Sequence, residues 1–276
     1  MTCDVITHPD KILFPDDGIT KGDLAAYYEA VASVMLPHLR GRPLTLERFP
    51  NGIGQEGFIQ KNVSRGFPEW LQRIEAPKAG GVVHYAAADD ARSLQWIVNQ
   101  NTVTLHVWPS RLPRLSNPDW CVIDLDPTRD DPERLCDVMA TLRTIVHDMG
   151  HRSWVKTSGS KGYHVVLPTG PRATFSTASR LAGRIAARLA EQRPDDVTLE
   201  FRKADRGERI YIDTARNRKG ATVAAAYSVR ARTGAPVSAP CTWEEIASGA
   251  MRPQSVTLRS MADRLAVVGD LWSDLV

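Results

Sequence analysis

The sequence predicts an α/β domain built on a central, mostly antiparallel sheet flanked by helices. Apolar stripes with helical spacing alternate along the chain with short β-branched runs. Several of these runs are joined by turns too short for a crossover, so neighbouring strands must run antiparallel. A chain of 276 residues can bury a sizeable core. We expect residues 1–276 to form a single domain with an N-terminal part, residues 1–118, and a core, residues 119–276.

The helices are predicted from apolar residues spaced three and four apart. Residues 21–39 carry such a stripe, Thr20 can cap its start, and Pro37 lies near its end. A second helix opens at Pro132 and ends at Gly150. Further helices are expected at residues 91–99, 176–193 and 242–247.

The strands are predicted from short apolar runs. The clearest is WCVIDL at residues 120–125, which Pro127 ends. A strand and loop are expected within residues 40–57, which are rich in Gly and Pro. The other expected strands are residues 102–108, 153–156, 163–167, 198–201, 210–213 and 222–228.

The composition excludes some classes of protein. The 35 Lys and Arg against 32 Asp and Glu give a pI near 8.7, which permits nucleic acid as a partner without requiring it. Cys3, Cys121, Cys136 and Cys241 form no CxxC pair, so we expect reduced thiols and a cytoplasmic protein. We expect that the N-terminal segment MTCDVITHPDK is not a signal peptide, and no apolar run approaches the ~20 residues that span a bilayer.

Acidic residues end two of the predicted strands. Asp124 and Asp126 lie two apart in IDLDP, so a strand would place both carboxylates on one face. Asp213 closes the strand RIYID. Three such carboxylates are suitable ligands for two divalent ions. The alternative for the Asp124 and Asp126 pair alone is a solvated strand end.

The turn between two predicted strands has the composition of a phosphate-binding loop. In TSGSKGYH, residues 157–164, small residues leave backbone N–H groups free, and Lys161 adds a positive charge. A strand follows this turn, so it is not a Walker loop. An ordinary turn with a solvated lysine is the alternative, and His164 is expected to be structural.

Basic residues surround Asp213 in the sequence. They suit a polyphosphate substrate or a nucleic-acid backbone, although any one of them could simply be solvated. They are Arg202, Lys203, Arg206, Arg209, Arg216, Arg218, Lys219, Arg230 and Arg232.

These motifs resemble one protein family. DKILFP, ITKGD, RFPNG, FIQK, LHVW, VIDLDP, TSGSKGYHV, IYID and AYSVRAR occur in the order found in the polymerase domain of bacterial ligase D. That family belongs to the archaeo-eukaryotic primase superfamily and serves non-homologous end joining. The resemblance covers nearly the whole chain and implies a primase-type catalytic domain. It assigns DNA-end binding to residues 1–118 and the metal and nucleotide sites to residues 119–276.

The resemblance also implies roles for individual residues. Catalytic metal ligands, for two Mn²⁺ or Mg²⁺ ions, would be Asp124, Asp126 and Asp213. Nucleotide-binding residues would be His106, Ser158, Gly159, Lys161, Gly162 and Arg230. DNA-binding residues would be Lys11, Lys21, Arg48, Phe58, Lys61 and Arg206, with Lys11 and Lys21 on a 5′-phosphate.

Two positions depart from the family pattern. Ile59 stands where the family often has a second aromatic residue that stacks on bases, and Glu47 stands where it often has a basic residue. In a strand, Phe58 and Ile59 would face opposite sides, so only one of them could meet DNA.

The function that the resemblance implies is template-dependent nucleotide addition to a 3′ end, with a preference for ribonucleotides. Expected partners are DNA ends or gapped DNA with a 5′-phosphate, NTP or dNTP, a DNA ligase and an end-binding protein. One alternative is gap filling in excision repair. A nuclease or phosphoesterase would not need the phosphate-binding turn, and an end-bridging module would not need the acids.

Overall fold

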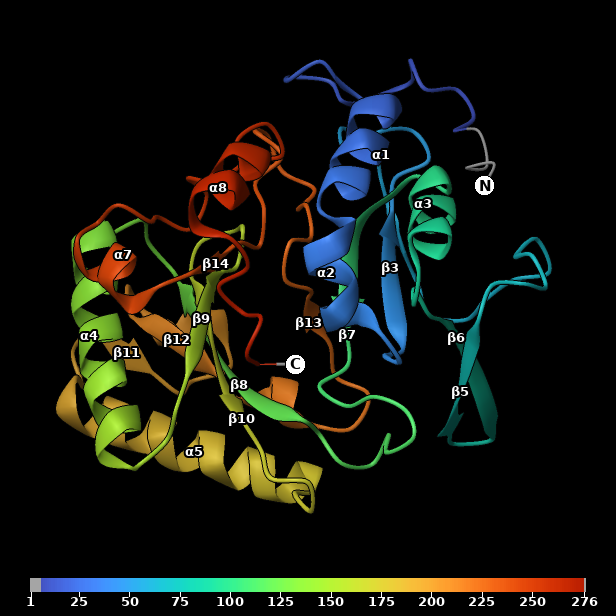
Figure 1. The fold of residues 1–276 in the computed structure, drawn as a ribbon. Helices are drawn as coiled ribbons and strands as arrows, with labels where there is room; N and C mark the ends of the chain where they lie inside the picture. Colours follow the sequence, from blue (N-terminus) through green and yellow to red (C-terminus); the bar gives the residue numbers. More distant parts are fainter. Residues whose placement is uncertain (1–5, 276) are drawn as a thin grey trace.

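A computed structural model describes residues 6–275 and contains two six-stranded sheets that lie side by side (Figure 1). In the first sheet all neighbours are antiparallel except β11 and β12. Two long helices, α4 (Pro132–Asp148) and α5 (Phe175–Gln192), flank this sheet. Its strands are, in order, β11 (Val197–Thr198), β12 (Ile210–Asp213), β8 (Trp120–Pro127), β10 (Tyr163–Pro168), β9 (Trp154–Thr157) and β14 (Pro240–Cys241).

The second sheet belongs mainly to the N-terminal half. Its strands are β13 (Val223–Ala224), β7 (Thr102–Val107), β3 (Leu44–Arg48), β6 (Gly81–Ala86) and β5 (Arg73–Lys78), with β4 (Phe58–Gln60) paired to β3. The helices α1 (Lys21–Ala30), α2 (Ala32–Leu39) and α3 (Ala91–Asn99) lie beside it. The remaining elements are β1 (Ile12–Phe14), β2 (Ile19–Thr20), α6 (Lys203–Arg206), the 3₁₀ turn η1 (Ala215–Asn217), α7 (Trp243–Ala247) and α8 (Met261–Val268). The predicted α/β class with helix-flanked antiparallel sheets is confirmed.

Buried side chains join the two halves. The Tyr27 hydroxyl donates to the carbonyl of Tyr227 at 2.7 Å, and the Val229 N–H donates to the Tyr28 hydroxyl at 3.1 Å. The Leu105 N–H donates to Ser228 Oγ at 2.8 Å. These bonds satisfy polar atoms inside the apolar core and fix the halves relative to each other.

The helix predicted over residues 21–39 is two helices. Thr20 caps α1 as expected, forming a capping box with Asp23. The helices meet at Val31, where φ is −92° and ψ is −1°, and the Val34 N–H donates to the Val31 carbonyl. The Met35 N–H also donates to this carbonyl at 2.9 Å, so a 3₁₀-type and an α-type bond share it where the two helices meet.

Two predicted strands are much shorter than expected. The strand over residues 198–201 ends at Thr198, and Leu199 and Phe201 are 48% and 75% exposed because the chain leaves the sheet. The strand over residues 222–228 is only β13, since Tyr227 has a φ of +68° that no strand can contain.

Cys121, Cys136 and Cys241 are free thiols, as expected, whereas Cys3 lies outside the described residues. Within residues 6–275, each helix is too short or too polar to cross a bilayer.

Candidate active site

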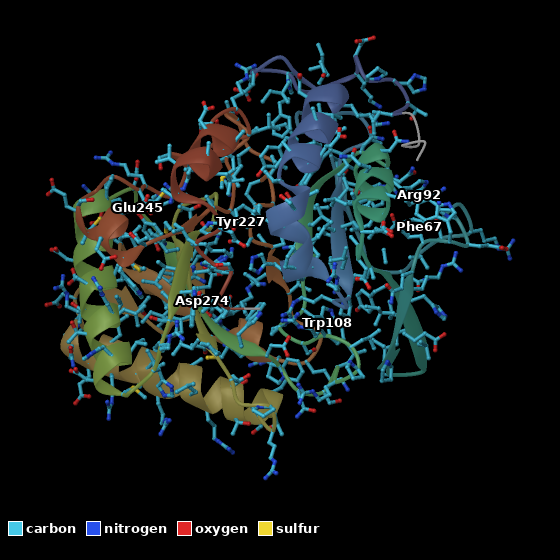
Figure 2. All side chains as sticks on the ribbon, in the orientation of Figure 1. Phe67, Arg92, Trp108, Tyr227, Glu245 and Asp274 are labelled. Atoms are coloured by element: carbon cyan, nitrogen blue, oxygen red, sulfur yellow. The ribbon has the colours of Figure 1, made fainter. Side chains whose placement is uncertain are left out.

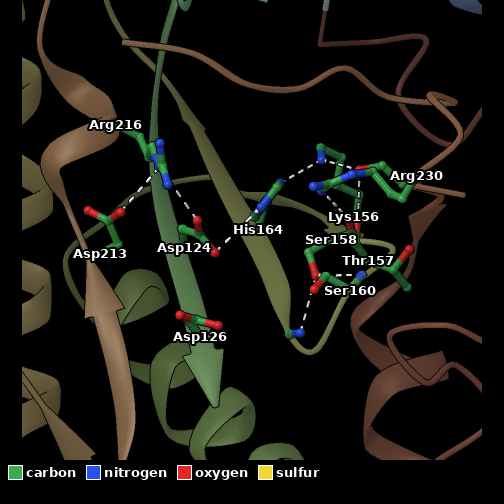
Figure 3. Close-up of polar contacts among 12 residues, drawn as sticks. Asp124, Asp126, Lys156, Thr157, Ser158, Ser160, His164, Asp213, Arg216 and Arg230 are labelled. Atoms are coloured by element: carbon green, nitrogen blue, oxygen red, sulfur yellow. Dashed lines mark hydrogen bonds and ion pairs between the residues drawn. The ribbon is translucent and has the colours of Figure 1, made fainter. Parts of the chain in front are cut away.

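Four polar side chains form one row across the first sheet. The strand register places Lys156 of β9 beside His164 of β10, His164 beside Asp124 of β8, and Asp124 beside Asp213 of β12 (Figure 3). Laterally paired residues share a face of the sheet. The sheet therefore gathers residues from four strands into one polar row, which we call the acid row.

Asp126 lies on the same face, two residues further along β8. It pairs in register with Tyr211, whereas the intervening Leu125 is only 1% exposed and faces the core. The Arg206 guanidinium lies 3.4 Å from the Asp126 carboxylate and stacks over the Tyr211 ring at 3.8 Å. Arg206 is 6% exposed, so its predicted contact with DNA stays a prediction.

The carboxylates of the acid row share one positive neighbour. Arg216 Nε lies 3.2 Å from Asp213 and 3.8 Å from Asp124. Burial, against the opposing effect of Arg216 and with smaller contributions from Asp213 and Asp126, raises the pKa of Asp124 to about 7. The carboxylate oxygens are hard ligands, and their negative charge exceeds the positive charge beside them. Mg²⁺ and Mn²⁺ prefer ligands of this kind.

The spacing of the acids, however, is not yet that of a metal cage. Over the part of the chain described, no three His, Cys, Asp or Glu side chains converge closely enough to hold an ion. The Arg216 guanidinium lies between Asp124 and Asp213, and the Arg206 guanidinium contacts the Asp126 carboxylate. Ligation by all three acids therefore stays a prediction, and it requires the arginines to move.

His164 is part of the acid row, although it was expected to be structural. Its Nδ1 lies 2.6 Å from Lys156 Nζ, which also donates to Ser238 Oγ at 2.5 Å. Its Nε2 lies 3.5 Å from the Asp124 carboxylate. Burial lowers the pKa of both His164 and Lys156 well below their usual values. If Lys156 donates to Nδ1, the neutral imidazole has its proton on Nε2, which faces Asp124.

The predicted phosphate turn is tightly closed. Ser158 Oγ accepts from the backbone N–H groups of Ser160 at 3.1 Å and Gly162 at 3.2 Å. Gly159 has a φ of +61°, and a Cβ there would lie 2.6 Å from Arg230 Cγ. At Gly162 a Cβ would lie 1.7 Å from the Leu125 carbonyl oxygen. Only glycine fits at either position.

Arg230 forms a hydrogen bond with this turn. Its Nη1 donates to the Ser158 carbonyl at 2.8 Å, and its Nε is a buried donor without a partner in the part of the chain described. Burial lowers the pKa of this guanidinium. An unpaired buried donor is costly, so an anion at this place would be stabilised.

Lys161 faces a neighbouring cavity rather than the acid row. It is exposed and lines a cavity of about 810 Å³ together with Arg129, Asp131 and Arg252. None of the acids of the acid row lines this cavity, which lies at the start of α4.

His106 comes to the site from the second sheet. On β7, its Nε2 lies 3.4 Å from the carboxylate of Glu47 on β3. Hydrogen bonding to His106 lowers the pKa of Glu47, whereas burial lowers the pKa of His106. The charge of Glu47, which departs from the family pattern, is thus directed at His106.

The predicted 5′-phosphate lysines lie together. The Lys21 backbone N–H donates to the Lys11 carbonyl at 2.8 Å. Lys21 is only 2% exposed, and its Nζ donates to the carbonyl of Thr7 at 2.7 Å. Burial and then the charge of Lys11 lower the pKa of Lys21, so an anion between the two ammonium groups would be stabilising.

The predicted base-stacking strand is exposed on both sides. Phe58 is 45% and Ile59 is 54% exposed, so neither lies in the core, and the expectation that only one of them meets DNA stays a prediction. Within residues 6–275, the three-residue strand β4 pairs with β3 alone, and none of its side chains is buried. The Arg48 guanidinium lies 5.2 Å from the centre of the Phe58 ring, and Lys61 beyond the strand is exposed.

A sheet that aligns carboxylates beside a glycine-containing turn and buried arginines is typical of nucleotidyl-transfer sites. The comparisons with known proteins agree. Residues 20–272 match the family model described as LigD, primase-polymerase domain. The chain is 34% identical over 273 residues to the multifunctional non-homologous end joining protein LigD of Mycolicibacterium smegmatis, covering 98% of this chain and 36% of that protein. The corresponding LigD protein of Pseudomonas aeruginosa is 33% identical over 272 residues, which cover 98% of this chain and 32% of that protein.

The structural comparison gives the same result. The fold matches the structure described as the polymerase domain from Mycobacterium tuberculosis ligase D in complex with DNA, with a TM-score of 0.92 and 35% identity over 98% of this chain and 97% of that one. The chain belongs to the LigD primase-polymerase domain family, and it is an enzyme of the nucleotidyltransferase type. It spans about a third of the length of the two LigD proteins compared.

Proposed function

We propose that this protein is a template-dependent polymerase that adds nucleotides to a 3′ end at DNA breaks or gaps during non-homologous end joining. The observation that carries the proposal is the acid row with Asp126 on the same face, next to a turn that Arg230 anchors. The end-joining role is supported by the names of its LigD relatives.

Asp124, Asp126 and Asp213 would hold two Mn²⁺ or Mg²⁺ ions in the position that Arg216 and Arg206 now neutralise. When bound, such ions lower the pKa of a primer hydroxyl and offset charge on the leaving pyrophosphate. His164, with its proton on Nε2, would keep Asp124 oriented toward the ions.

The nucleotide would bind between the two sheets. Arg230, with its unpaired Nε, and the turn formed by Ser158, Gly159 and Gly162 would receive its phosphates, with Lys161 at the turn's outer edge. His106 would approach from the second sheet. A preference for ribonucleotides would follow if a polar group of the site bonds the 2′-hydroxyl, since a deoxy substrate would leave it unpaired.

DNA would bind across the N-terminal half. The complex formed by the Mycobacterium tuberculosis relative supports DNA as a ligand. Lys11 and Lys21 would bind a 5′-phosphate, while Arg48, Phe58 and Lys61 would contact the strand that enters the site, with Arg206 beside Asp126. A DNA ligase and an end-binding protein would act with it in the cytoplasm.

Primer extension on gapped DNA with labelled nucleotide and Mn²⁺ tests the proposal. Extension that copies the template supports it. Shortening of the primer would instead identify a nuclease, and a gel shift without any change of primer length would identify a binding module.

A further inference from the structure

Helix α5 carries an unpaired row of arginines on its outer edge. Arg180, Arg184 and Arg188 are exposed and lie four residues apart, so they share one face of the helix. No hydrogen bond or ion pair holds any of the three among residues 6–275. Side chains with nitrogen tips project into solvent along this edge (Figure 2).

This arrangement costs stability. Like charges four residues apart destabilise a helix by roughly 0.2–0.5 kcal/mol per pair, and α5 contains two such pairs. Glu191 is the one acidic residue in α5, and it lies beyond Arg188. Some exposed arginines elsewhere have carboxylate partners, as Arg143 with Glu244 and Arg152 with Asp274. The row on α5 has no such partner among the described residues.

The positive surface continues past the start of α5. Arg114 donates to the carbonyl of Pro171 at 3.1 Å, next to the exposed Arg172. Lys219 donates to Ser116 Oγ at 3.2 Å, and Ser179 of α5 donates to the carbonyl of Asn217 at 2.9 Å. These bonds join three loops and the helix into one surface. This basic face consists of Arg114, Arg172, Arg180, Arg184, Arg188 and Lys219.

The basic face is separate from the acid row. The apolar side of α5, including Ala182 and Ile185, is buried and packs toward β8, on which Leu125 faces the core. Asp124 and Asp126 point away from Leu125 because side chains alternate along a strand. A polyanion bound to α5 would therefore lie on the opposite side of the sheet from the reacting 3′ end.

We propose that the basic face binds the phosphodiester backbone of a DNA segment outside the active site. This inference rests on the proposed function. From Arg180 to Arg188 the helix rises about 12 Å, at 1.5 Å per residue, which spans roughly three or four phosphates of one strand. Evenly spaced guanidinium groups match an evenly charged backbone, and arginine binds phosphate in a bidentate manner.

The test compares two variants with the same change of charge. In the first, Arg180→Gln, Arg184→Gln and Arg188→Gln are combined, because glutamine keeps the helix propensity of arginine. The control combines Arg143→Gln, Arg152→Gln and Arg259→Gln, whose guanidinium groups already have protein partners. Thermal unfolding checks that both variants fold. Binding to a long duplex and to a short gapped hairpin is measured at several salt concentrations.

We expect the α5 variant to bind the long duplex at least about tenfold more weakly, with a salt slope reduced by roughly two to three. Its binding to the short hairpin and the control variant's binding to both DNAs should stay close to those of the unmodified protein. Equal long-duplex affinity for the two variants would overturn the proposal, as would an equal loss on the short hairpin. The proposal would also be overturned if the α5 variant bound polyglutamate more weakly but kept its DNA binding, because that result would indicate an acidic protein partner.

These binding measurements separate the inference from the proposed function. If the protein extends no primer but the α5 variant loses long-duplex affinity, the proposed polymerase function is refuted and DNA binding by the basic face is supported. If the protein extends primers but the α5 variant binds like the control, the polymerase function is supported and the role of the basic face is refuted.

Discussion

The acid row and strand β4 place functional side chains in opposite surroundings. In the acid row, Lys156 and His164 are 1% and 4% exposed, and His164 contacts both Lys156 and Asp124. On β4, Phe58 and Ile59 are about half exposed and rest on a single neighbouring strand. A buried row fixes geometry, so one change there alters chemistry. An exposed strand offers only contact area, so one change there alters affinity by a modest amount.

The largest effect is expected in the acid row. Asp124→Ala and Asp126→Ala, tested separately, should each reduce primer extension by more than about a hundredfold, because lost metal binding removes several kcal/mol of transition-state stabilisation. DNA binding should persist, since the predicted DNA-binding lysines lie in the other half. Extension assays with Mn²⁺ and anisotropy on gapped DNA measure the two effects. The exposed Asp263→Ala serves as control, and near-normal extension by either variant would disprove the metal assignment.

The phosphate turn should give the next effect. Gly159→Ala would force a Cβ to within 2.6 Å of Arg230 and strain a φ of +61°. Gly80→Ala is the matched control, because its φ is +76° and nothing lies within 4 Å. We expect Gly159→Ala to raise the KM for nucleotide and to lower the melting temperature beyond the control, by the ~1–3 kcal/mol typical of overpacking. Identical melting temperatures and KM values would show that the turn and Arg230 are not coupled.

The lysine pair should affect one kind of DNA end. Lys11 and Lys21 should increase affinity for gapped DNA with a 5′-phosphate by about tenfold, close to 1.4 kcal/mol, over the same DNA without it. Titrations with both DNAs measure this preference, and the double variant Lys11→Ala/Lys21→Ala should lose it. Lys78→Ala, at the exposed end of β5, is the control. A preference that survives in the double variant would contradict the assignment.

The smallest effect is expected on β4. Because Ile59 is 54% exposed, Ile59→Phe should leave stability unchanged. A stacked aromatic ring contributes roughly 1–3 kcal/mol per base by alanine substitution, and replacing a branched aliphatic side chain should gain less. We expect tighter binding to gapped or overhanging DNA, measured against Val267→Phe on α8, where residue 267 is 84% exposed. A lower melting temperature without a gain in affinity would refute the stacking hypothesis.

The sequence predicted best where a pattern is local. The strand over residues 210–213 is β12 without any change, and Asp124 and Asp126 share a face because alternation is a property of one strand. The role of His164 was missed because it depends on the register between β10 and β8. Counting back from the turn at Gly159 gives only the pairing of His164 with Lys156, because α4 and β9 separate β8 from β10 along the chain.

Other features depend on packing between distant segments. The buried state of Lys21 depends on Thr7 and that of Arg206 on Asp126 and Tyr211, and no spacing rule reports such partners. Both Phe58 and Ile59 are exposed because no other part of the described chain covers either face of β4. A strand pattern assumes that one face is buried, and here that assumption fails.

The side chain of Asn217, which is 1% exposed, explains how the chain turns at the acid row. Its amide accepts from the Val122 N–H at 2.8 Å and donates to the Val122 carbonyl at 2.7 Å. These are the two bonds that β12 would have made had it continued beyond Asp213. One amide thus imitates a peptide unit and releases the main chain, which can bend into η1 and carry Arg216 back over the carboxylates. Asn217→Asp would keep the shape of the side chain but remove its N–H donor. The bond from the Val122 N–H would remain, whereas the Val122 carbonyl would face a carboxylate oxygen, which cannot donate to it.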